Sequence, residues 1–481
     1  MNLKSIINLF GILVMFFSMS FIFPMIVSWV YMDKSLDIFV LTFLIVFTFG
    51  FLGWYCTKGS IKDLSQSDGF IIITFFWLIL SIAGSIPFYL SGMSLVDSFF
   101  ESMSGITTTG ATVLSGLDDM PQSILFYRQL LQWMGGMGLI VLAIAVMPLL
   151  GIGGGQLYKA EIPGAMNDQK LTPRIKETAQ ALWAIYLILT LVCAFLYFVA
   201  GMTVFDAISH SLSTVSIGGF STHDLSIGYF NNRAVEIICM VFMLLSALSF
   251  TLHYFAFYMK KPLKYFYDPE LRFFISIVIL IFTITAFINF FSSNSDATIS
   301  QLLFQSISII TTTGFSIGDT SGWSPSIGFL LLIGAFVGAC SGSVGGGVKS
   351  WRVLIIINYA YITLKKMIHP NAVISLKIGT KSVDDSVASS VWGFFSIYVI
   401  SFVILLLSLL VTGLDFESAF SAIGACLNNL GPGLGEVSNN YQSVSSAGKV
   451  ILSLFLALFT IKVEEKAFLP KKLTFTPLRY F

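Results

Sequence analysis

Ten apolar segments of this sequence are long enough to cross a lipid bilayer. A helix needs about 20 mainly apolar residues to span a hydrocarbon core of ~30 Å. The chain is 56% hydrophobic and 11% charged over 481 residues, and a soluble globule could not bury that much apolar surface. We therefore expect an all-α integral membrane protein with spans near residues 8–31, 37–55, 69–91, 124–150, 179–201, 233–259, 271–293, 325–362, 387–412 and 444–468.

Four polar stretches rich in glycine interrupt the apolar sequence, each between two expected spans. They are Ser102–Leu114 (SMSGITTTGATVL), His210–Thr222 (HSLSTVSIGGFST), Gln305–Asp319 (QSISIITTTGFSIGD) and Ser421–Glu436 (SAIGACLNNLGPGLGE). A single stretch of Thr and Gly would be explained equally well by close helix packing. Four of them favour one recurring unit of span, re-entrant loop and span.

This recurrence divides the chain into a helix pair, four repeats and a tail. The helix pair (1–60) has no glycine stretch and is expected at the periphery. The expected repeats cover 68–150, 176–259, 271–364, with a broken second helix, and 384–468, and the tail covers 469–481.

A polar residue precedes the glycine of each stretch by thirteen or fourteen positions. These residues are Asp97, Asp206, Gln301 and Glu417. Aspartate is a good N-cap, and a carboxylate there suits the positive end of the helix dipole. We therefore expect four short pore helices of about three turns to begin at these residues.

The basic residues predict the orientation of the chain. With the N-terminus inside, the outer connections carry only Lys34, Arg128, Arg233 and Lys449, which leaves 22 of the 26 Lys and Arg on the inner side. This distribution satisfies the positive-inside rule and places both termini in the cytoplasm. All four glycine stretches then lie in the outer half of the membrane. The inner basic residues are explained by topology and lipid headgroups, with a docking surface for a cytoplasmic partner as the alternative.

The glycine stretches have the composition that dehydration of a cation requires. Backbone carbonyls can replace a hydration shell when a non-helical chain turns them to one side, and glycine permits the φ/ψ values involved. Such backbone persists at membrane depth only where protein buries it or a water-filled path adjoins it. Four loops around one axis would form a ring of oxygens. The spans contain no nucleophile, acid/base pair or metal-ligand set, so the sequence predicts a cation path and not an enzyme.

The third repeat contains an oversized apolar segment. Residues 325–364 are nearly twice as long as a span needs, and SGSVGGGVKS (Ser341–Ser350) breaks them midway. Glycine at this density interrupts a helix, and a loop just below the ring would act as a gate, with close helix packing as the alternative. Lys349 is either a positive barrier or an ordinary headgroup anchor. The predicted gate residues are Ser341, Gly342, Ser343, Val344, Gly345, Gly346, Gly347 and Lys349.

Three acidic residues stand five positions beyond a glycine of these stretches. They are Asp224, Asp319 and Glu436. An acidic outer mouth would concentrate cations through a potential of a few kT at most. The alternative is that they are ordinary solvated loop residues.

Several stretches resemble the TrkH family of bacterial potassium-uptake proteins, within the Trk/Ktr/HKT superfamily. They are Phe99–Gly164, Ile217–Phe230 (IGGFSTHDLSIGYF), His369–Val373 (HPNAV) and Leu427–Gly435 (LNNLGPGLG). The resemblance implies potassium uptake across the bacterial inner membrane by a homodimer with four pore-loop repeats. It also implies a cytoplasmic nucleotide-binding partner of the TrkA type, with the nucleotide on that partner. We further expect potassium as the substrate and contacts with membrane lipids. We expect no covalently bound cofactor and no nucleic-acid partner.

The resemblance also assigns a potassium-binding filter. In plant relatives a serine in the first copy tends to accompany sodium, so Gly110 favours potassium. An ion-coupled symporter driven by protons or sodium remains the alternative, although inverted repeats would alternate in direction. The filter residues are Thr108, Thr109, Gly110, Ile217, Gly218, Gly219, Thr312, Thr313, Gly314, Asn429, Leu430 and Gly431.

The C-terminus departs from the family pattern. These proteins usually carry an arginine on the last helix, below the filter, where this chain has Thr460. Lys462 is two residues further on, which is a rotation of about 200° on a helix. The residues from Val463 onward are also more polar than expected.

Overall fold

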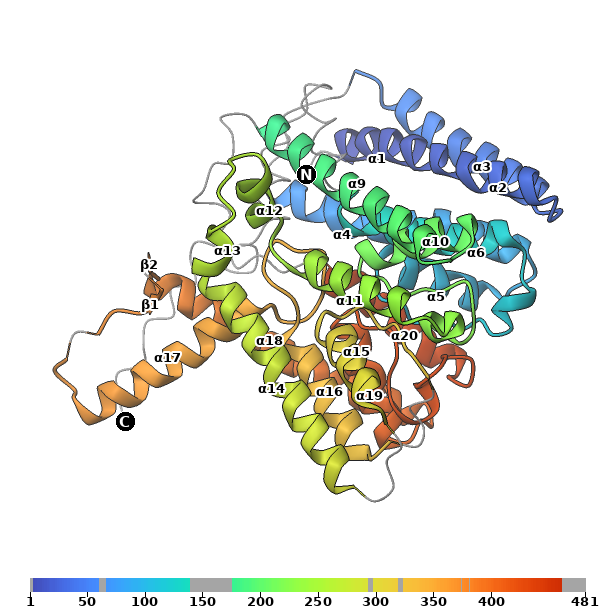
Figure 1. Cartoon of the computed structure of the whole chain (residues 1–481). Coiled ribbons are helices and arrows are strands. Elements are labelled where there is room, and N and C mark those ends of the chain that lie inside the picture. The colour runs from blue at the N-terminus through green and yellow to red at the C-terminus, as the bar shows by residue number, and fades with distance from the viewer. Residues whose placement is uncertain are drawn as a thin grey trace.

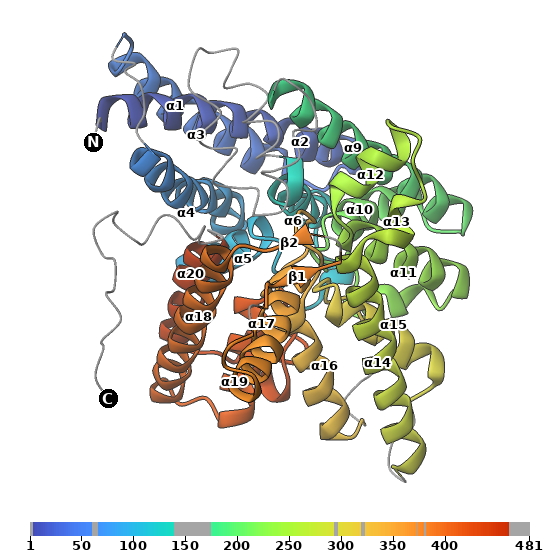
Figure 2. The same cartoon turned by 90° about the vertical axis from the view of Figure 1, so that its left-hand side faces the viewer.

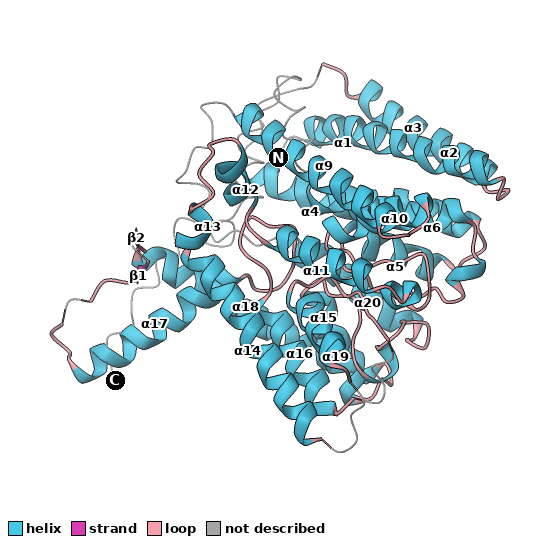
Figure 3. Ribbon diagram, viewed as in Figure 1, coloured by secondary structure: helices cyan, strands magenta, loops and turns pink. Residues whose placement is uncertain are grey.

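Helices dominate the structure, which is a computed structural model. It describes residues 3–59, 66–138, 175–292, 297–318, 323–372, 374–379 and 381–460. The strands that it describes form a single antiparallel hairpin of β1 (Lys377–Ile378) and β2 (Lys381–Ser382) (Figure 3). The expectation of an all-α membrane protein is confirmed.

Six of the ten expected spans coincide with helices that are long and apolar enough to cross a membrane. Five are continuous or nearly so, and the sixth is a pair of helices bent by 98°. They are α1 (Leu3–Ser18) with η1 (Met19–Phe21) and α2 (Ile22–Tyr31), α3 (Leu36–Cys56), α9 (Ile175–Val199), α14 (Pro269–Phe291), α18 (Asp385–Val411), and the bent pair α11 (Arg233–Ala247) and α12 (Phe250–Phe257).

The other four expected spans are shorter, broken or partly described. In α4 (Gln66–Leu90) the side chains are described only from Phe75 onward. Helix α6 (Gln122–Trp133) continues into a π-helical turn, η3, at Met134–Gly138, where the description stops. The third is divided into α16 (Pro325–Val337) and α17 (Ser350–Ile368), and the fourth is α20 (Ser446–Thr460).

Four short helices, each of 12 residues, precede the four glycines. They are α5 (Leu95–Ile106), α10 (Val204–Val215), α15 (Ile299–Ile310) and α19 (Phe416–Leu427). Most of their residues are buried, although several are serine, threonine or other polar types.

The N-caps of these short helices lie two or three residues before the predicted positions. The N-caps are Ser94, Thr203, Thr298 and Asp415, and each side chain accepts a hydrogen bond from the backbone N–H three residues later. The prediction that Asp97, Asp206, Gln301 and Glu417 open the helices is therefore wrong: all four lie within the first turn. The physical reason is that a better N-cap precedes each of them. Thr298 and Gln301 form a capping box, the hydroxyls of Ser94 and Thr203 donate to Asp97 and Asp206, and Asp415 caps the fourth helix through Ser418 N.

The first and last parts of the chain lie side by side. Figure 2 shows α4 and α5 next to α18 and α20, while α1 to α3 run along one side of the molecule. Lys449 of α20 forms an ion pair with Asp97 of α5 at 2.7 Å, so these two helices are in direct contact. Helix α17 and the β hairpin project from the body (Figure 1).

The N-terminal helix pair packs through glycine and aromatic contacts. Gly11 of α1 lies against the backbone of Gly50 and Trp54 in α3, which is the close approach that small residues permit between spans. The rings of Phe21 and Phe39 lie 5.7 and 5.5 Å from that of Tyr127 on α6. The pair is thus attached to the body by an aromatic cluster.

We predict that Gly11→Leu separates α1 from α3. A Cβ at Gly11 would lie 2.5 Å from Trp54 N and 2.7 Å from Gly50 O, and overpacking of this kind costs about 1–3 kcal/mol. The thermal unfolding midpoint of the purified protein in detergent should fall by a few degrees. Phe16→Leu, at a side chain that is 46% exposed, should leave it unchanged. An unaltered midpoint in Gly11→Leu would contradict the packing described here.

Candidate functional site

Each of the four short helices ends in the same turn. The residue just before the glycine donates its N–H to a carbonyl five positions earlier, the outer hydrogen bond of a Schellman motif. The bonds are Thr109 N to Ser104 O (2.9 Å), Gly218 N to Ser213 O (2.9 Å), Thr313 N to Ser308 O (2.8 Å) and Leu430 N to Ala425 O (2.9 Å).

The turn gives positive φ to two of the three residues that end at each glycine. We call these sets of three, 108–110, 217–219, 312–314 and 429–431, the first to fourth segments. The first residue is not glycine: φ is 58° at Thr108, 54° at Ile217, 63° at Thr312 and 53° at Asn429. The third residue is glycine, with φ from 81° to 88°. Positive φ at a β-branched residue is an outlier, and strain of this type is retained mainly at functional sites.

The four glycines form a closed ring. A Cβ added to any of them would lie closer than 3.0 Å to the carbonyl oxygen that precedes the next glycine in the ring. The pairs are Gly110 with Gly218 O, Gly219 with Thr313 O, Gly314 with Leu430 O, and Gly431 with Thr109 O. The last pair returns to the first segment, so backbone from four distant parts of the chain encloses one axis. We call this set the glycine ring.

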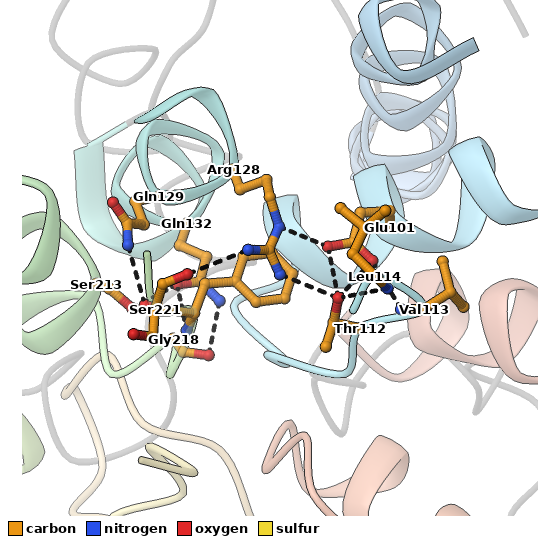
Figure 4. A network of polar contacts seen from close by, with 11 residues as sticks. Glu101, Thr112, Val113, Leu114, Arg128, Gln129, Gln132, Ser213, Gly218 and Ser221 are labelled. Carbon is orange, nitrogen blue, oxygen red and sulfur yellow. Dashed lines mark hydrogen bonds and ion pairs between the residues drawn. The ribbon is translucent and has the colours of Figure 1, made fainter. Parts of the chain in front are cut away.

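A buried ion pair supports the ring beside its first segment. Arg128 Nε lies 2.8 Å from Glu101 Oε1, and the two side chains are 1% and 0% exposed (Figure 4). Glu101 also accepts hydrogen bonds from Thr112 Oγ1 and Val113 N, both at 3.0 Å. Arg128 donates to Ser221 O at 3.1 Å, so the pair joins the residues that follow Gly110 and Gly219.

The fourth segment is tied to the first by Tyr441 and Lys449. Tyr441 donates its hydroxyl to Gly431 O and its N–H to Thr112 O, both at 2.8 Å. Lys449 Nζ binds Asp97 Oδ1 at 2.7 Å. These contacts close the ring between the two ends of the chain.

Two histidines flank the second segment. His210 contacts Ser221 Oγ through Nε2 (2.9 Å) and Asp206 O through Nδ1 (3.0 Å). His223 lies between the carboxylates of Asp206 and Asp118. Burial of the His223 ring lowers its pKa, but the two carboxylates outweigh that effect and hold the pKa above its usual range. Among the described residues, no group of His, Cys, Asp and Glu is placed to hold a metal ion.

The segment between α16 and α17 is a loop that touches three of the four ring segments. We call Ser341–Gly347 the glycine loop. Gly346 N donates to Thr312 Oγ1 (2.7 Å), and an added Cβ at Gly346 would lie 3.1 Å from Asn429 Cβ. An added Cβ at Gly345 would lie 3.6 Å from Ile217 Cδ1. Gly347 N also donates to Asn428 O (3.1 Å), just before the fourth segment.

The break between α11 and α12 is paired with the glycine loop. Cys340 N donates to Ala247 O, and Phe250 N donates to Gly342 O, both at 3.0 Å. A helix break leaves backbone N–H and C=O groups without intrahelical partners, which is costly where water is absent. Each break therefore supplies hydrogen-bond partners for backbone groups of the other.

Glu270 fastens both ends of the glycine loop. It lies in the first turn of α14 and is 7% exposed. Its Oε1 accepts hydrogen bonds from Ser341 N at 2.5 Å and from Trp351 N at 3.1 Å. One carboxylate oxygen thus holds the residues on either side of the glycines.

Lys349 folds back onto the same loop. It has φ of 80°, is 1% exposed, and donates from Nζ to Ser343 O (3.4 Å) and to Gly345 O. The alternative of a lipid-headgroup anchor is wrong, because a headgroup anchor needs an accessible ammonium group.

Two of the three predicted outer acidic residues lie in the described part of the chain. Asp224 and Glu436 are exposed, and Asp224 Oδ2 accepts a hydrogen bond from Leu117 N at 3.1 Å. Asp319 lies outside the described residues, as do Lys462 and the tail from residue 463. Thr460 ends α20, and its side chain is not described.

The sequence interpretation missed two supporting residues. Arg128 was expected in an outer connection, but it lies within α6 and is buried. Glu270 was not singled out. A signal existed for Arg128, because a charge inside an apolar span usually has a buried partner. Its partner, Glu101, lies 27 positions away, so the pairing itself could not be read from local pattern.

We predict that Arg128→Met destabilises the protein more than the double variant Glu101→Gln/Arg128→Met. Loss of one member leaves a buried charge without its partner, which costs about 3–5 kcal/mol. Thermal unfolding midpoints in detergent would show a large fall for the single variant and a smaller fall for the double variant. Arg233→Met, at an exposed arginine, is the matched control. A single variant as stable as the double variant would exclude this role for the pair.

Comparison with known proteins agrees with this architecture. The TrkH family model, described as a cation transport protein, matches residues 35–460. The chain is 47% identical over 477 residues to the Trk system potassium uptake protein TrkH of Vibrio parahaemolyticus, covering 96% of this chain and 98% of that protein. It is 44% identical over 475 residues to TrkH of Escherichia coli K12, covering 96% and 98%.

A solved structure matches over nearly the whole fold. The crystal structure of the potassium transporter TrkH from Vibrio parahaemolyticus superposes with a TM-score of 0.87 at 44% sequence identity, covering 97% of this chain and 98% of that chain. The match extends over both the family-model region and the helices around the glycine ring. The chain belongs to the TrkH family of cation transport proteins.

Proposed function

We propose that this protein carries potassium into bacteria across the cytoplasmic membrane, through a path that runs along the axis of the glycine ring. Relatives that match 96% of the chain are named potassium uptake proteins. The observation that carries the proposal is the closed ring, in which each glycine packs on a carbonyl of the next segment. Transport, and not catalysis, is the function that such a backbone ring supports.

The ring would act as the selectivity filter. The sign of φ changes between successive residues of each segment, and this alternation turns successive carbonyls toward one side, so that oxygens can replace the water around a cation. The filter comprises Thr108, Thr109, Gly110, Ile217, Gly218, Gly219, Thr312, Thr313, Gly314, Asn429, Leu430 and Gly431. The same turn in all four segments supports an origin in four repeats of helix, pore loop and helix.

The glycine loop and Lys349 would form the gate. The loop lies against the helix-proximal residues of three ring segments, so an ion leaving the ring on that side meets it. The Glu270 carboxylate and the backbone of the α11–α12 break hold the loop by hydrogen bonds, and its glycines give it alternative conformations at low cost. Filter and gate are then separate elements on one axis.

We infer passive, channel-like conduction over proton- or sodium-coupled symport. A ring of backbone carbonyls needs no second coupled ion to dehydrate its substrate. Flux of potassium and sodium through the purified protein in liposomes, with no coupling gradient supplied, distinguishes the two mechanisms. Potassium flux that requires an imposed proton or sodium gradient would favour symport.

The remaining features of the proposal concern assembly and topology. Trk systems have more than one component, and we propose a homodimer with a cytoplasmic nucleotide-binding subunit of the TrkA type, which would carry the nucleotide. The excess of basic residues on one side supports cytoplasmic N- and C-termini. Asp224, Asp319 and Glu436 would then lie at the outer mouth.

We predict that Gly110→Ser reduces the preference for potassium over sodium. Gly110 has φ of 82° and packs on Gly218 O, so a Cβ and a hydroxyl must change the geometry of the ring. Permeability ratios from proteoliposome flux provide the measurement. The matched control is Gly116→Ser, at a glycine with φ of 70° and nothing within 4 Å of an added Cβ. Equal ratios in Gly110→Ser and the parent protein would refute the placement of the filter.

We predict that deletion of Gly345–Gly347 raises ion flux without abolishing the preference for potassium. The deletion removes the hydrogen bonds to Thr312 and Asn428 and shortens the obstruction below the ring, while the ring residues remain. Flux and the potassium-to-sodium ratio are measured in the same proteoliposomes, and gel filtration checks folding. A well-folded deletion variant that is no leakier than the parent would mean that the loop packs helices and does not gate.

A further inference from the structure

Gln132 is a buried amide side chain to which the proposal above gives no role. It lies near the C-terminal end of α6 and is 0% exposed. Its Nε2 donates to Gly218 O at 2.6 Å, and its Oε1 accepts from Ser213 Oγ at 2.6 Å and from Phe220 N at 3.1 Å (Figure 4). A side chain from the helix that follows the first ring segment therefore holds the second segment.

The second segment differs from the others in what lies behind it. Thr109 and Thr313 each place a hydroxyl 2.8 Å from that of the threonine two positions earlier, and Leu430 is buried in an apolar cluster. The corresponding residue of the second segment is Gly218, which has no side chain. An added Cβ there would collide with Gln132 Cδ, so the amide occupies the space that a side chain fills in the other three segments.

The oxygen that Gln132 engages belongs to the glycine ring. Gly218 O is the atom on which Gly110 packs. A hydrogen bond from an amide fixes the position of this oxygen and draws electron density from it. Position and field strength are the two properties by which an oxygen ring distinguishes potassium from sodium, and a weaker field favours the larger, more easily dehydrated ion.

We propose that Gln132 is a positioning residue for ion selectivity, which holds the Gly218 carbonyl at the junction of the first and second segments. This inference rests on the proposed filter role of the glycine ring. It assigns part of the selectivity to a helix outside the four segments. The mechanism acts through the Gly218 carbonyl, because the amide of Gln132 bonds to that oxygen.

The first test is Gln132→Met, which nearly conserves volume and removes all three hydrogen bonds. One hydrogen bond contributes about 1 kcal/mol, so we expect the sodium-to-potassium permeability ratio to rise about fivefold. Flux rates are measured in proteoliposomes for potassium and for sodium separately, each at saturating and at limiting ion concentration. These rates distinguish altered selectivity from a general loss of flux. Gln129→Met is the matched control: Gln129 is a buried glutamine on the same helix whose Nε2 bonds Phe220 O at 3.4 Å, outside the ring.

The second test is a double-mutant cycle with Gly218→Ala. The new Cβ would displace the Gln132 amide, so this variant should shift the ratio in the same direction. If both residues act through one contact, the variant Gln132→Met/Gly218→Ala should be no less selective than either single variant, since coupled sites are not additive. Independent, additive shifts would overturn the proposal. If Gln132→Met does not fold, the sodium-to-potassium permeability ratio of Gly218→Ala tests the proposal, and an unchanged ratio would overturn it.

Gly110→Ser, measured in the same assay, separates this inference from the proposed filter. If Gly110→Ser shifts the ratio and Gln132→Met does not, the role of Gln132 is refuted and the filter stands. If neither variant shifts the ratio, the filter proposal fails, and this inference fails with it. A fall in the thermal midpoint of Gln132→Met with an unchanged ratio would show a purely structural role and would also refute the inference.

Discussion

The contact between each ring glycine and a carbonyl oxygen of the next segment is the constraint on which the rest of the structure depends. The contact leaves no room for a Cβ, and it requires the chain to turn sharply at the end of each short helix. This turn places Thr108, Ile217 and Thr312 at positive φ. β-Branched residues adopt that conformation only when their surroundings impose it. The surrounding helices must therefore hold the ring in place.

Buried polar contacts supply that restraint. The Glu101–Arg128 pair joins the residues after the first and second glycines, while Tyr441 and Lys449 connect the fourth segment and its helix to the first. Arg128 and Lys449 are also two of the four basic residues expected on the outer side. Both side chains pair with buried or partly buried carboxylates.

The glycine loop solves a related problem of backbone hydrogen bonding. Two interrupted helices, α11–α12 and α16–α17, expose N–H and C=O groups that water cannot reach in a membrane. They satisfy one another through Ala247, Phe250, Cys340 and Gly342, and Glu270 holds the remaining N–H groups at both ends of the loop. Hydrogen bonds to the α11–α12 break, to Glu270 and to Thr312 therefore hold the loop in one position against the ring.

The sequence by itself determined the features that depend on local composition. Apolar length specified the long helices, the four polar glycine stretches specified where the membrane-spanning pattern is interrupted, and SGSVGGGVKS specified the break between α16 and α17. Even the departures were small, as with the helix starts at Ser94 and Thr203. Only the tertiary structure decided which distant groups meet: Gln132 with Gly218, 86 positions apart, and Glu270 with Ser341, 71 positions apart. The reason is physical, because hydropathy and glycine content act through the solvent and the local backbone, whereas a buried hydrogen bond depends on the relative placement of two helices that no local pattern encodes.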